Sequence, residues 1–174
     1  MGGNMWFGKR SVAVVGVVGG SRRTALSVVG SLLALALLGI GLLHVVWTVS
    51  TWPLADRDDF ARLVVGVPVD QLPSPVMTAA VAAALVVAAM LVGAQARMLP
   101  AGPIPARVLR AGVVLVAVVL LLRGGGGLVA DLAGMDLGPR DFARMDRIVY
   151  SPLCVALGLA AAWVASRGLG SARE

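Results

Sequence analysis

Residues 24–43, TALSVVGSLLALALLGIGLL, and residues 76–94, VMTAAVAAALVVAAMLVGA, contain no charged side chain. A helix rises about 1.5 Å per residue and the hydrocarbon core of a bilayer is about 30 Å thick, so each stretch is long enough to cross a membrane. With 59% hydrophobic residues and a mean hydropathy of +0.91 over 174 residues, the chain has too little polar surface to coat a water-soluble globule. We therefore expect an all-α integral membrane protein.

Two further apolar runs extend this prediction to a four-helix transmembrane bundle, with spans at about 24–47, 75–96, 108–123 and 146–166. The third run is short. Its helix either begins near Pro105 or continues past Arg123 through four consecutive glycines. Each glycine costs a helix about 1 kcal/mol relative to alanine. We therefore expect this helix to end at Arg123, with the glycines forming a close-packed turn.

The charged residues are distributed unequally between the two sides of these spans. The two loops 48–74 and 124–145, with the helix ends beside them, hold six arginines against eight aspartates. The N-terminus, the 97–107 loop and the C-terminus hold nine cations against one anion, Glu174; these cations are Lys9, Arg10, Arg22, Arg23, Arg97, Arg107, Arg110, Arg167 and Arg173. By the positive-inside rule, both termini are expected to be cytoplasmic, which makes this a multi-pass plasma (inner) membrane protein.

The ends of the chain are expected to lie outside the bundle, as a basic cytoplasmic segment, 1–23, and a cytoplasmic tail, 167–174. Residues 11–20 are apolar but too few to span a membrane, so they are expected to form either an interfacial helix or a disordered lead-in.

Several function classes conflict with the sequence. The cations punctuate the ends of apolar segments, which is unlike a nucleic-acid surface. One cysteine, Cys154, cannot form an internal disulfide or a CxxC pair, and one histidine cannot provide two axial haem ligands. No group of residues has the spacing of a zinc site, and the four glycines lack the lysine of a phosphate-binding loop. We expect no cofactor and no metal.

Polar residues inside lipid are the default candidates for function, and in this chain they fall near the outward ends of the spans. His44 and Trp47 end the first span, Arg123 ends the third, and Asp146 and Tyr150 open the fourth. His44 and Asp146 are candidate acid/base residues. Arg123, Tyr150 and Trp47 are candidate ligand-binding residues, with Arg123 suited to an anionic headgroup.

Each candidate also has a structural interpretation. His44 can bond a backbone carbonyl at its helix end, and Trp47 and Tyr150 fit an interfacial aromatic belt. Arg123 can form an interhelical ion pair with Asp131 or Asp146. The tetrapeptide Asp-Phe-Ala-Arg occurs at 59–62 and at 141–144, each time in an outward loop, and is weak evidence for a duplication.

Three segments, LLHVVWTVST (42–51), LLLRGGGGL (120–128) and DFARMDRIVYSPLCVALGL (141–159), resemble a group of small bacterial membrane proteins catalogued as domain of unknown function 3995. The pattern of that group has His-x-x-Trp, Leu-Arg-Gly-x-Gly-Gly and Tyr-Ser-Pro-Leu-Cys. A glycine pair often follows the tryptophan in the group, whereas Thr48 follows it here. The resemblance covers most of residues 25–165. It implies four helices and no established activity.

We therefore expect a non-enzymatic accessory or lipid-associated membrane protein, with membrane lipids as partners and with a further protein or a second copy as an additional one. The alternative is a small enzyme acting on a lipid or isoprenoid substrate at the outer leaflet. In that case His44 and Asp146 would transfer protons and Arg123 would hold the anion. A transporter fits less well, because the middle of the membrane carries no charge.

Overall fold

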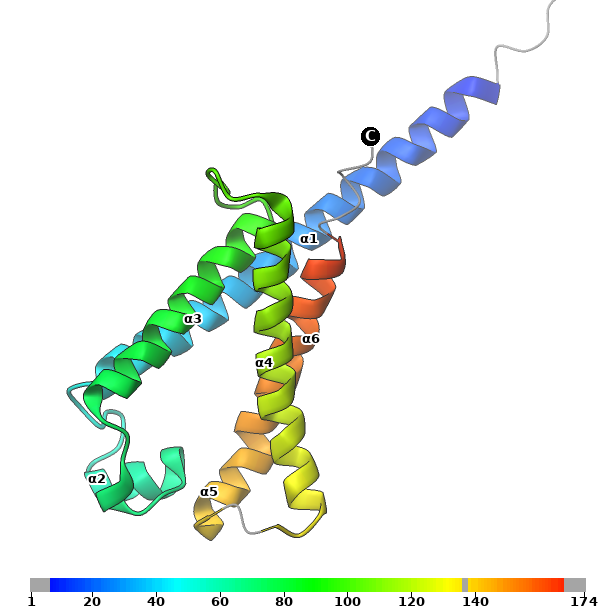
Figure 1. The fold of residues 1–174 in the computed structure, drawn as a ribbon. Coiled ribbons are helices and arrows are strands. Elements are labelled where there is room, and N and C mark those ends of the chain that lie inside the picture. The colour runs from blue at the N-terminus through cyan, green and yellow to red at the C-terminus, as the bar shows by residue number, and fades with distance from the viewer. Residues whose placement is uncertain (1–6, 136–137, 168–174) are drawn as a thin grey trace, which may run out of the picture.

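The computed structural model describes residues 7–135 and 138–167. In that part of the chain, four helical segments are long and apolar enough to cross a membrane, and they are Arg23–Trp47, Pro75–Gln95, Ala106–Leu132 and Arg140–Arg167 (Figure 1). This confirms the expected all-α fold with four membrane-crossing helices. Residues 1–6 of the expected N-terminal segment, and the expected tail after Arg167, lie outside the described residues.

The first long helix, α1, runs without interruption from Phe7 to Trp47. Its membrane-crossing part, Arg23–Trp47, agrees with the expected span 24–47 to within one residue. The helix extends beyond that span at its N-terminal end, and residues 11–20, expected to form either an interfacial helix or a disordered lead-in, are helical. No proline occurs between residues 7 and 47, so no residue in this range removes a helical hydrogen bond. The N-terminal part of α1 projects beyond the other long helices (Figure 1).

The second long helix, α3 (Pro75–Gln95), coincides with the expected range 75–96 to within one residue. Its start is fixed by Ser74, whose Oγ accepts a hydrogen bond from the Met77 amide at 3.3 Å. Pro75 occupies the first helical position, where its missing N–H leaves no bond unmade. The loop before α3 contains the short helix α2 (Arg57–Phe60), a π-helical turn η1 (Ala61–Val65) and a 3₁₀ turn η2 (Val69–Gln71).

The third long helix, α4, runs from Ala106 to Leu132 and passes straight through the glycine run. The expectation that it ends at Arg123 is therefore wrong. The reason lies in packing, because two of the four glycines face the fourth helix at distances that no side chain would allow. The packing energy recovered at these two positions offsets the low helix propensity of the run.

The fourth membrane-crossing segment consists of three consecutive elements, α5 (Arg140–Met145), the π-helical turn η3 (Asp146–Tyr150) and α6 (Ser151–Arg167). The π turn lies immediately before Pro152, and in it the Ser151 amide donates to the Asp146 carbonyl. Proline has no N–H to donate, so the regular hydrogen-bond pattern of the helix is interrupted at this position.

The helices form two hairpins, in which α1 packs along α3 and α4 packs along α6. The hairpins share a core of small and aliphatic side chains that includes Leu37, Val92, Val113 and Val164. Val92, Val113 and Val164 lie in the halves of their helices farthest from the 48–74 and 133–145 segments, whose side of the molecule we call the loop end, and Leu37 lies near the middle of the span Arg23–Trp47. Toward the loop end the two hairpins diverge (Figure 1).

Candidate functional site

The best-defined polar contact inside the bundle joins the two helices of the second hairpin. Nη2 of Arg123, on α4, lies 2.5 Å from Oδ1 of Asp146, in η3. The Asp146 side chain is 3% exposed, whereas that of Arg123 is 45% exposed. Of the two interhelical partners considered for Arg123, the structure therefore selects Asp146 over Asp131. A charge buried in an apolar bundle needs an opposite charge and hydrogen bonds, and Asp146 has both.

Ser151 completes this contact, and the sequence analysis did not single it out. Its Oγ donates to Oδ2 of Asp146 at 2.7 Å, and the residue is fully buried. The π turn makes the contact possible, because it places residue 151 five positions after residue 146 on the same side of the helix. The sequence feature that could have identified Ser151 is a serine directly before a proline within an apolar span. We refer to Arg123, Asp146 and Ser151 as the polar triad.

Gly124 and Gly127 provide the space for the polar triad. A Cβ atom on Gly127 would collide with Oγ of Ser151, and would lie 2.5 Å from Oδ2 of Asp146 and 3.2 Å from Nη1 of Arg123. A Cβ atom on Gly124 would lie 2.6 Å from the Ser151 carbonyl oxygen. Gly125 and Gly126 face open space. The glycine run thus lets the α4 backbone approach α6 closely, and lets the guanidinium of Arg123 extend over residue 127.

The polar triad lies below the loop end, within the segments Ala106–Leu132 and Arg140–Arg167 that are long and apolar enough to cross a membrane. A second ion pair of the same hairpin, between Nε of Arg147 and Oδ2 of Asp131 at 3.3 Å, lies nearer the loop end. Arg123 precedes Asp131 by eight residues of continuous helix, which corresponds to about 12 Å along α4. The Arg123 backbone is therefore well inside the span, while its side chain reaches toward the loop end to meet Asp146.

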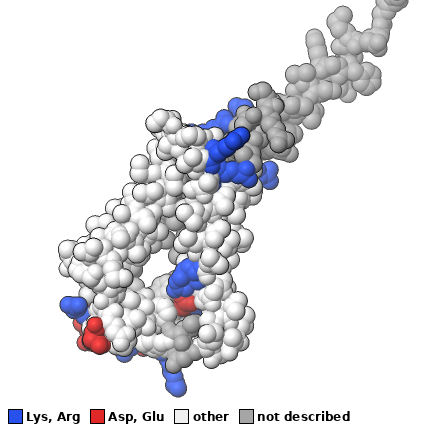
Figure 2. Space-filling view, viewed as in Figure 1, with Lys and Arg blue, Asp and Glu red and all other residues white. Residues whose placement is uncertain are grey.

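The exposed part of Arg123 is relevant because the molecule is hollow between its hairpins. Figure 2 shows an opening between the two hairpins, with a basic and an acidic patch next to each other at its edge. Among the described residues, the hydrogen bond recorded for the guanidinium goes to Asp146. Arginine carries five N–H donors. The group therefore keeps donors for a further acceptor.

At the loop end, the two hairpins are joined by a small set of contacts that we call the loop clasp. The hydroxyl of Tyr150 donates to the Leu63 carbonyl at 3.0 Å, and Nε of Arg62 lies 3.4 Å from Oδ2 of Asp141. Glycine 66 lies against the Phe142 ring, where a Cβ would come within 2.6 Å of ring atoms. The clasp thus consists of Arg62, Leu63, Gly66, Asp141, Phe142 and Tyr150. It brings both Asp-Phe-Ala-Arg segments together.

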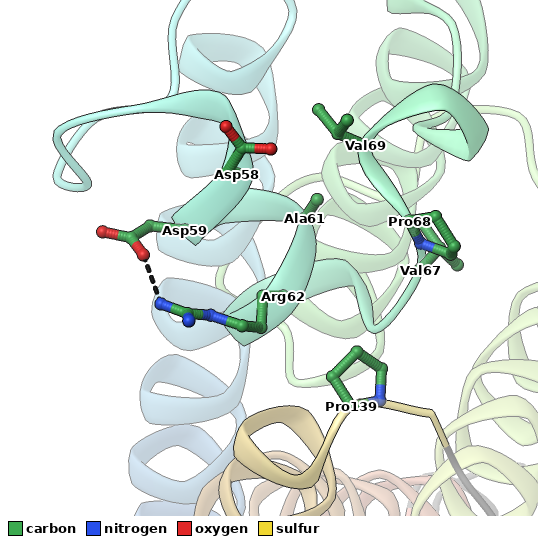
Figure 3. Close-up of a pocket in the computed structure, with 8 residues that line it drawn as sticks. All are labelled: Asp58, Asp59, Ala61, Arg62, Val67, Pro68, Val69 and Pro139. Atoms are coloured by element: carbon green, nitrogen blue, oxygen red, sulfur yellow. Dashed lines mark hydrogen bonds and ion pairs between the residues drawn. The ribbon is translucent and has the colours of Figure 1, made fainter.

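A shallow pocket of about 290 Å³ lies beside the loop clasp (Figure 3). Arg62 lines it and is held there by Asp59, at 2.5 Å. None of the candidate residues from the sequence analysis lines this pocket, whose wall consists of Asp58, Asp59, Ala61, Arg62, Val67, Pro68, Val69 and Pro139.

His44 and Trp47 form a separate cluster at the end of α1. Nδ1 of His44 lies 2.8 Å from the Ile40 carbonyl oxygen, one turn earlier in the same helix, and the centroid of its ring lies 4.8 Å from that of Trp47 with the planes tilted by 58°. Nε1 of Trp47 donates to the Trp52 carbonyl, and its ring packs edge-on against the buried Phe60. Within the part of the chain that the structure describes, no hydrogen bond or ion pair joins His44 to Asp146.

Tyr150, the remaining candidate residue, makes structural contacts. Tyr150 belongs to the loop clasp through its hydroxyl, and its ring lies 6.1 Å from Phe142. Cys154 is partly buried against Gly124, with a free thiol. Within residues 7–135 and 138–167, no group of three or more His, Cys, Asp or Glu side chains is arranged to hold a metal ion.

Comparison with known proteins gives one match. The sequence model of a family described as protein of unknown function (DUF3995) matches residues 37–161, which include Arg123, Asp146 and Ser151. No curated protein and no solved structure matches the chain.

Proposed function

The chain belongs to the DUF3995 family of proteins of unknown function, and we propose that it is a non-enzymatic, lipid-associated accessory protein of the bacterial inner membrane. In this proposal the opening between its hairpins holds a membrane lipid, and Arg123 binds the phosphate of the headgroup. Both termini and the 97–107 loop face the cytoplasm, so the loop end lies at the outer surface. The support for this orientation is the excess of cations on the opposite side.

One observation carries the proposal: the guanidinium of Arg123 is held by Asp146 on one side, and the rest of the side chain is accessible. The buried carboxylate of Asp146 holds the guanidinium at a set height in the bundle, while 45% of the side chain is accessible. Hydrogen bonds from a guanidinium to a phosphate are charge-assisted and geometrically well matched. A headgroup phosphate at the outer level of the membrane is the acceptor that a lipid environment offers to such a group.

The arrangement of His44 favours this proposal over the alternative of a lipid-modifying enzyme. Proton transfer between His44 and a substrate next to Asp146 would require both groups at one reacting atom, within hydrogen-bond reach. His44 is instead paired with the backbone of its own helix and packed on Trp47, on the other hairpin. Asp146 is fully engaged by Arg123 and Ser151, which suits a structural anion better than an acid or base.

The test is the lipid retained by the purified protein. We expect native mass spectrometry of the wild-type chain in mild detergent to show bound phospholipid, and Arg123→Gln to reduce the bound fraction about tenfold, because a charge-assisted hydrogen bond contributes on the order of 1.5 kcal/mol. The same spectra will report a second copy of the chain or a bound protein partner.

Arg147→Gln is the matched control, because Arg147 is also paired with an aspartate of the same hairpin but lies nearer the loop end. It should leave lipid retention unchanged. If Arg123→Gln folds poorly, the neutral pair Arg123→Gln with Asp146→Asn preserves a hydrogen bond without the cation. Equal lipid retention by the wild type and by the folded variants would refute the proposal.

A further inference from the structure

One face of α1 is exposed along the whole membrane-crossing part of the helix. The residues of this face are spaced alternately by three and four positions, and they are Ala25, Val28, Leu32, Leu35, Gly39, Leu42 and Val46. Leu33 and Leu37, which α1 contributes to the core, lie on the opposite side of the helix. Alternate spacing by three and four is that of the contact positions of a coiled coil. We call these seven exposed residues the α1 seam.

The same helix is much longer than a membrane is thick. It has 41 residues, which corresponds to about 60 Å, or about twice the thickness of the hydrocarbon core. Residues 7–22 therefore continue past the span Arg23–Trp47, in the same direction (Figure 1). Their sequence, FGKRSVAVVGVVGGSR, consists mainly of valine and glycine. Both are poor helix formers, so a helix of this composition depends on packing against a partner.

The charges of this extension select the same register as the exposed residues of the span. Continuing the spacing of the α1 seam toward the N-terminus reaches Phe7, Ser11, Val14, Val18 and Ser21. The four cations of the extension, at positions 9, 10, 22 and 23, all fall between these residues. Of the seven possible heptad registers, this is the only one that leaves residues 7–23 without a charge at a contact position. The exposed residues of the span and the uncharged positions of the extension therefore follow one continuous register.

A second copy of α1 is the partner that matches this register along its whole length. Two copies inserted in one membrane have the same orientation, so their α1 helices run parallel and the same positions meet. In a parallel coiled coil, each position g of one helix lies beside the position e that follows five residues later in the other. This arrangement places Arg10 opposite Val15 and Arg22 opposite Val17, so that no two cations face each other. Lipid can cover only the part of α1 inside the membrane and would leave the extension in water.

We infer that the chain forms a parallel homodimer, in which the α1 seam and its continuation to Phe7 pack against the same residues of a second copy. Inside the membrane, the leucines of the seam associate by van der Waals packing. Beyond the membrane, the valines at the contact positions are removed from water, which is the larger driving force there. The seam lies on α1 whereas Arg123 lies on α4. Dimer formation and lipid binding are therefore tested separately.

Single cysteines in a Cys154→Ser background test the contact, with oxidative cross-linking by copper phenanthroline in isolated membranes. We expect Leu35→Cys to form a covalent dimer about fivefold more efficiently than Leu115→Cys, a control on α4, because contact positions of a parallel coiled coil face each other. Both leucines are 63% exposed, and only Leu35 belongs to the α1 seam. In the extension, Val14→Cys should cross-link, and Val12→Cys, which lies outside the register, should not.

A second pair of variants measures the affinity of the dimer without cross-linking. Val14→Lys places two ammonium groups against each other at a contact position outside the membrane. We expect it to raise the dissociation constant of the dimer about tenfold, because juxtaposed like charges are costly. Val12→Lys adds the same charge outside the register and should leave the dissociation constant unchanged. Native mass spectrometry of the full-length chain on dilution in mild detergent gives both values.

Three outcomes would overturn the homodimer. Equal cross-linking of Leu35→Cys and Leu115→Cys would show that copies meet only by random collision. Cross-linking at Leu35→Cys without cross-linking at Val14→Cys, or equal effects of the two lysine variants, would show that the extension does not continue the contact. A Leu35→Cys adduct with a different protein in place of the dimer would assign the seam to another partner.

Discussion

At the scale of single residues, the two members of the central ion pair are not equivalent. Asp146 is almost completely shielded, while the side chain of Arg123 is nearly half accessible. Removing the partner of a buried charge costs more than removing the partner of a charge that can reach water or a headgroup. The bundle therefore depends on Arg123 more strongly than on Asp146.

This asymmetry gives a direct prediction for stability. We expect Arg123→Gln to lower the free energy of unfolding by about 3 kcal/mol, because it leaves the Asp146 carboxylate buried and uncompensated. Asp146→Asn should cost about 1 kcal/mol, since the amide keeps an acceptor for Ser151. The double variant should recover most of the loss. Unfolding in mixed micelles, followed by circular dichroism, measures all three. A larger loss for Asp146→Asn than for Arg123→Gln would contradict this account.

The residue types of this site were predictable, but their partners were not. An arginine and an aspartate in apolar spans must be paired, so the sequence indicated a pair and left Asp131 and Asp146 as alternatives. The choice depends on the register between two helices, and that register depends on the glycine contacts and the π turn. Ser151 was missed for the same reason, because in a regular helix it would not face the carboxylate of residue 146.

At the scale of secondary structure elements, the glycine run shows why local propensity gave the wrong helix end. Propensity describes an isolated helix, in which four glycines are costly. In the bundle, Gly124 and Gly127 are positions of backbone contact with α6, whereas Gly125 and Gly126 face open space. Hydropathy was sufficient to locate the four spans, because the apolar interior of a bilayer requires long apolar helices whatever their neighbours are. It contains no information about which faces touch.

The glycine run 124–127 therefore contains both a packed position and an unpacked control position. We expect Gly127→Ala to lower the free energy of unfolding by about 2 kcal/mol, because the new methyl group overlaps Ser151 and Asp146. Gly126→Ala should raise it by up to about 1 kcal/mol, since the same methyl group meets no neighbour and improves helix propensity. Thermal unfolding in a single detergent compares the two. A loss of stability in both variants, or in neither, would show that α4 is not packed as described.

Both Asp-Phe-Ala-Arg segments occur in short helices that continue into π turns, η1 and η3, and the two segments contact each other. The sequence revealed the repeat but not its contact. Arg62 of the first segment reaches Asp141 of the second, so the two loops are joined through repeated residues. These loops lie at the end of the bundle away from the shared core of Val92, Val113 and Val164, and their contacts join the hairpins there.

At the scale of the whole molecule, the two hairpins are held unequally at their two ends. One end has a continuous apolar core that includes Leu33, Leu37, Val92, Val113 and Val164. The other has the loop clasp, whose ion pair is exposed and contributes at most about 1 kcal/mol. The loop end should therefore open locally at a much lower free energy than global unfolding.

Hydrogen exchange can test this inequality. We expect Tyr150→Phe combined with Asp141→Asn to increase exchange several-fold in residues 57–66 and 140–150, because the hydrogen bond and the ion pair of the loop clasp are lost. Exchange in α3 near Val92 and in α4 near Val113 should not change. Asp58→Asn is the control. A uniform increase through all helices would mean that the clasp and the core form one cooperative unit.

The membrane orientation is the property of the whole molecule on which the location of the site depends. On the loop end, Arg62, Arg123 and Arg147 each lie beside an aspartate. In the sequence, the N-terminus, the 97–107 loop and the C-terminus together have nine cations against one anion, and Arg167 lies over the Trp163 ring at 5.3 Å. Because an excess of cations is retained in the cytoplasm, the 97–107 loop should face inward and the loop end outward.

Single cysteines introduced into a Cys154→Ser background test this orientation. We expect Asp58→Cys to react with a membrane-impermeant maleimide in intact cells, and Pro103→Cys to react only after permeabilisation. The two positions lie in loops on opposite sides of the four spans, so their labelling must be opposite in either orientation. If Pro103→Cys is the one labelled in intact cells, Arg123 faces the inner leaflet and the headgroup it meets is a cytoplasmic one.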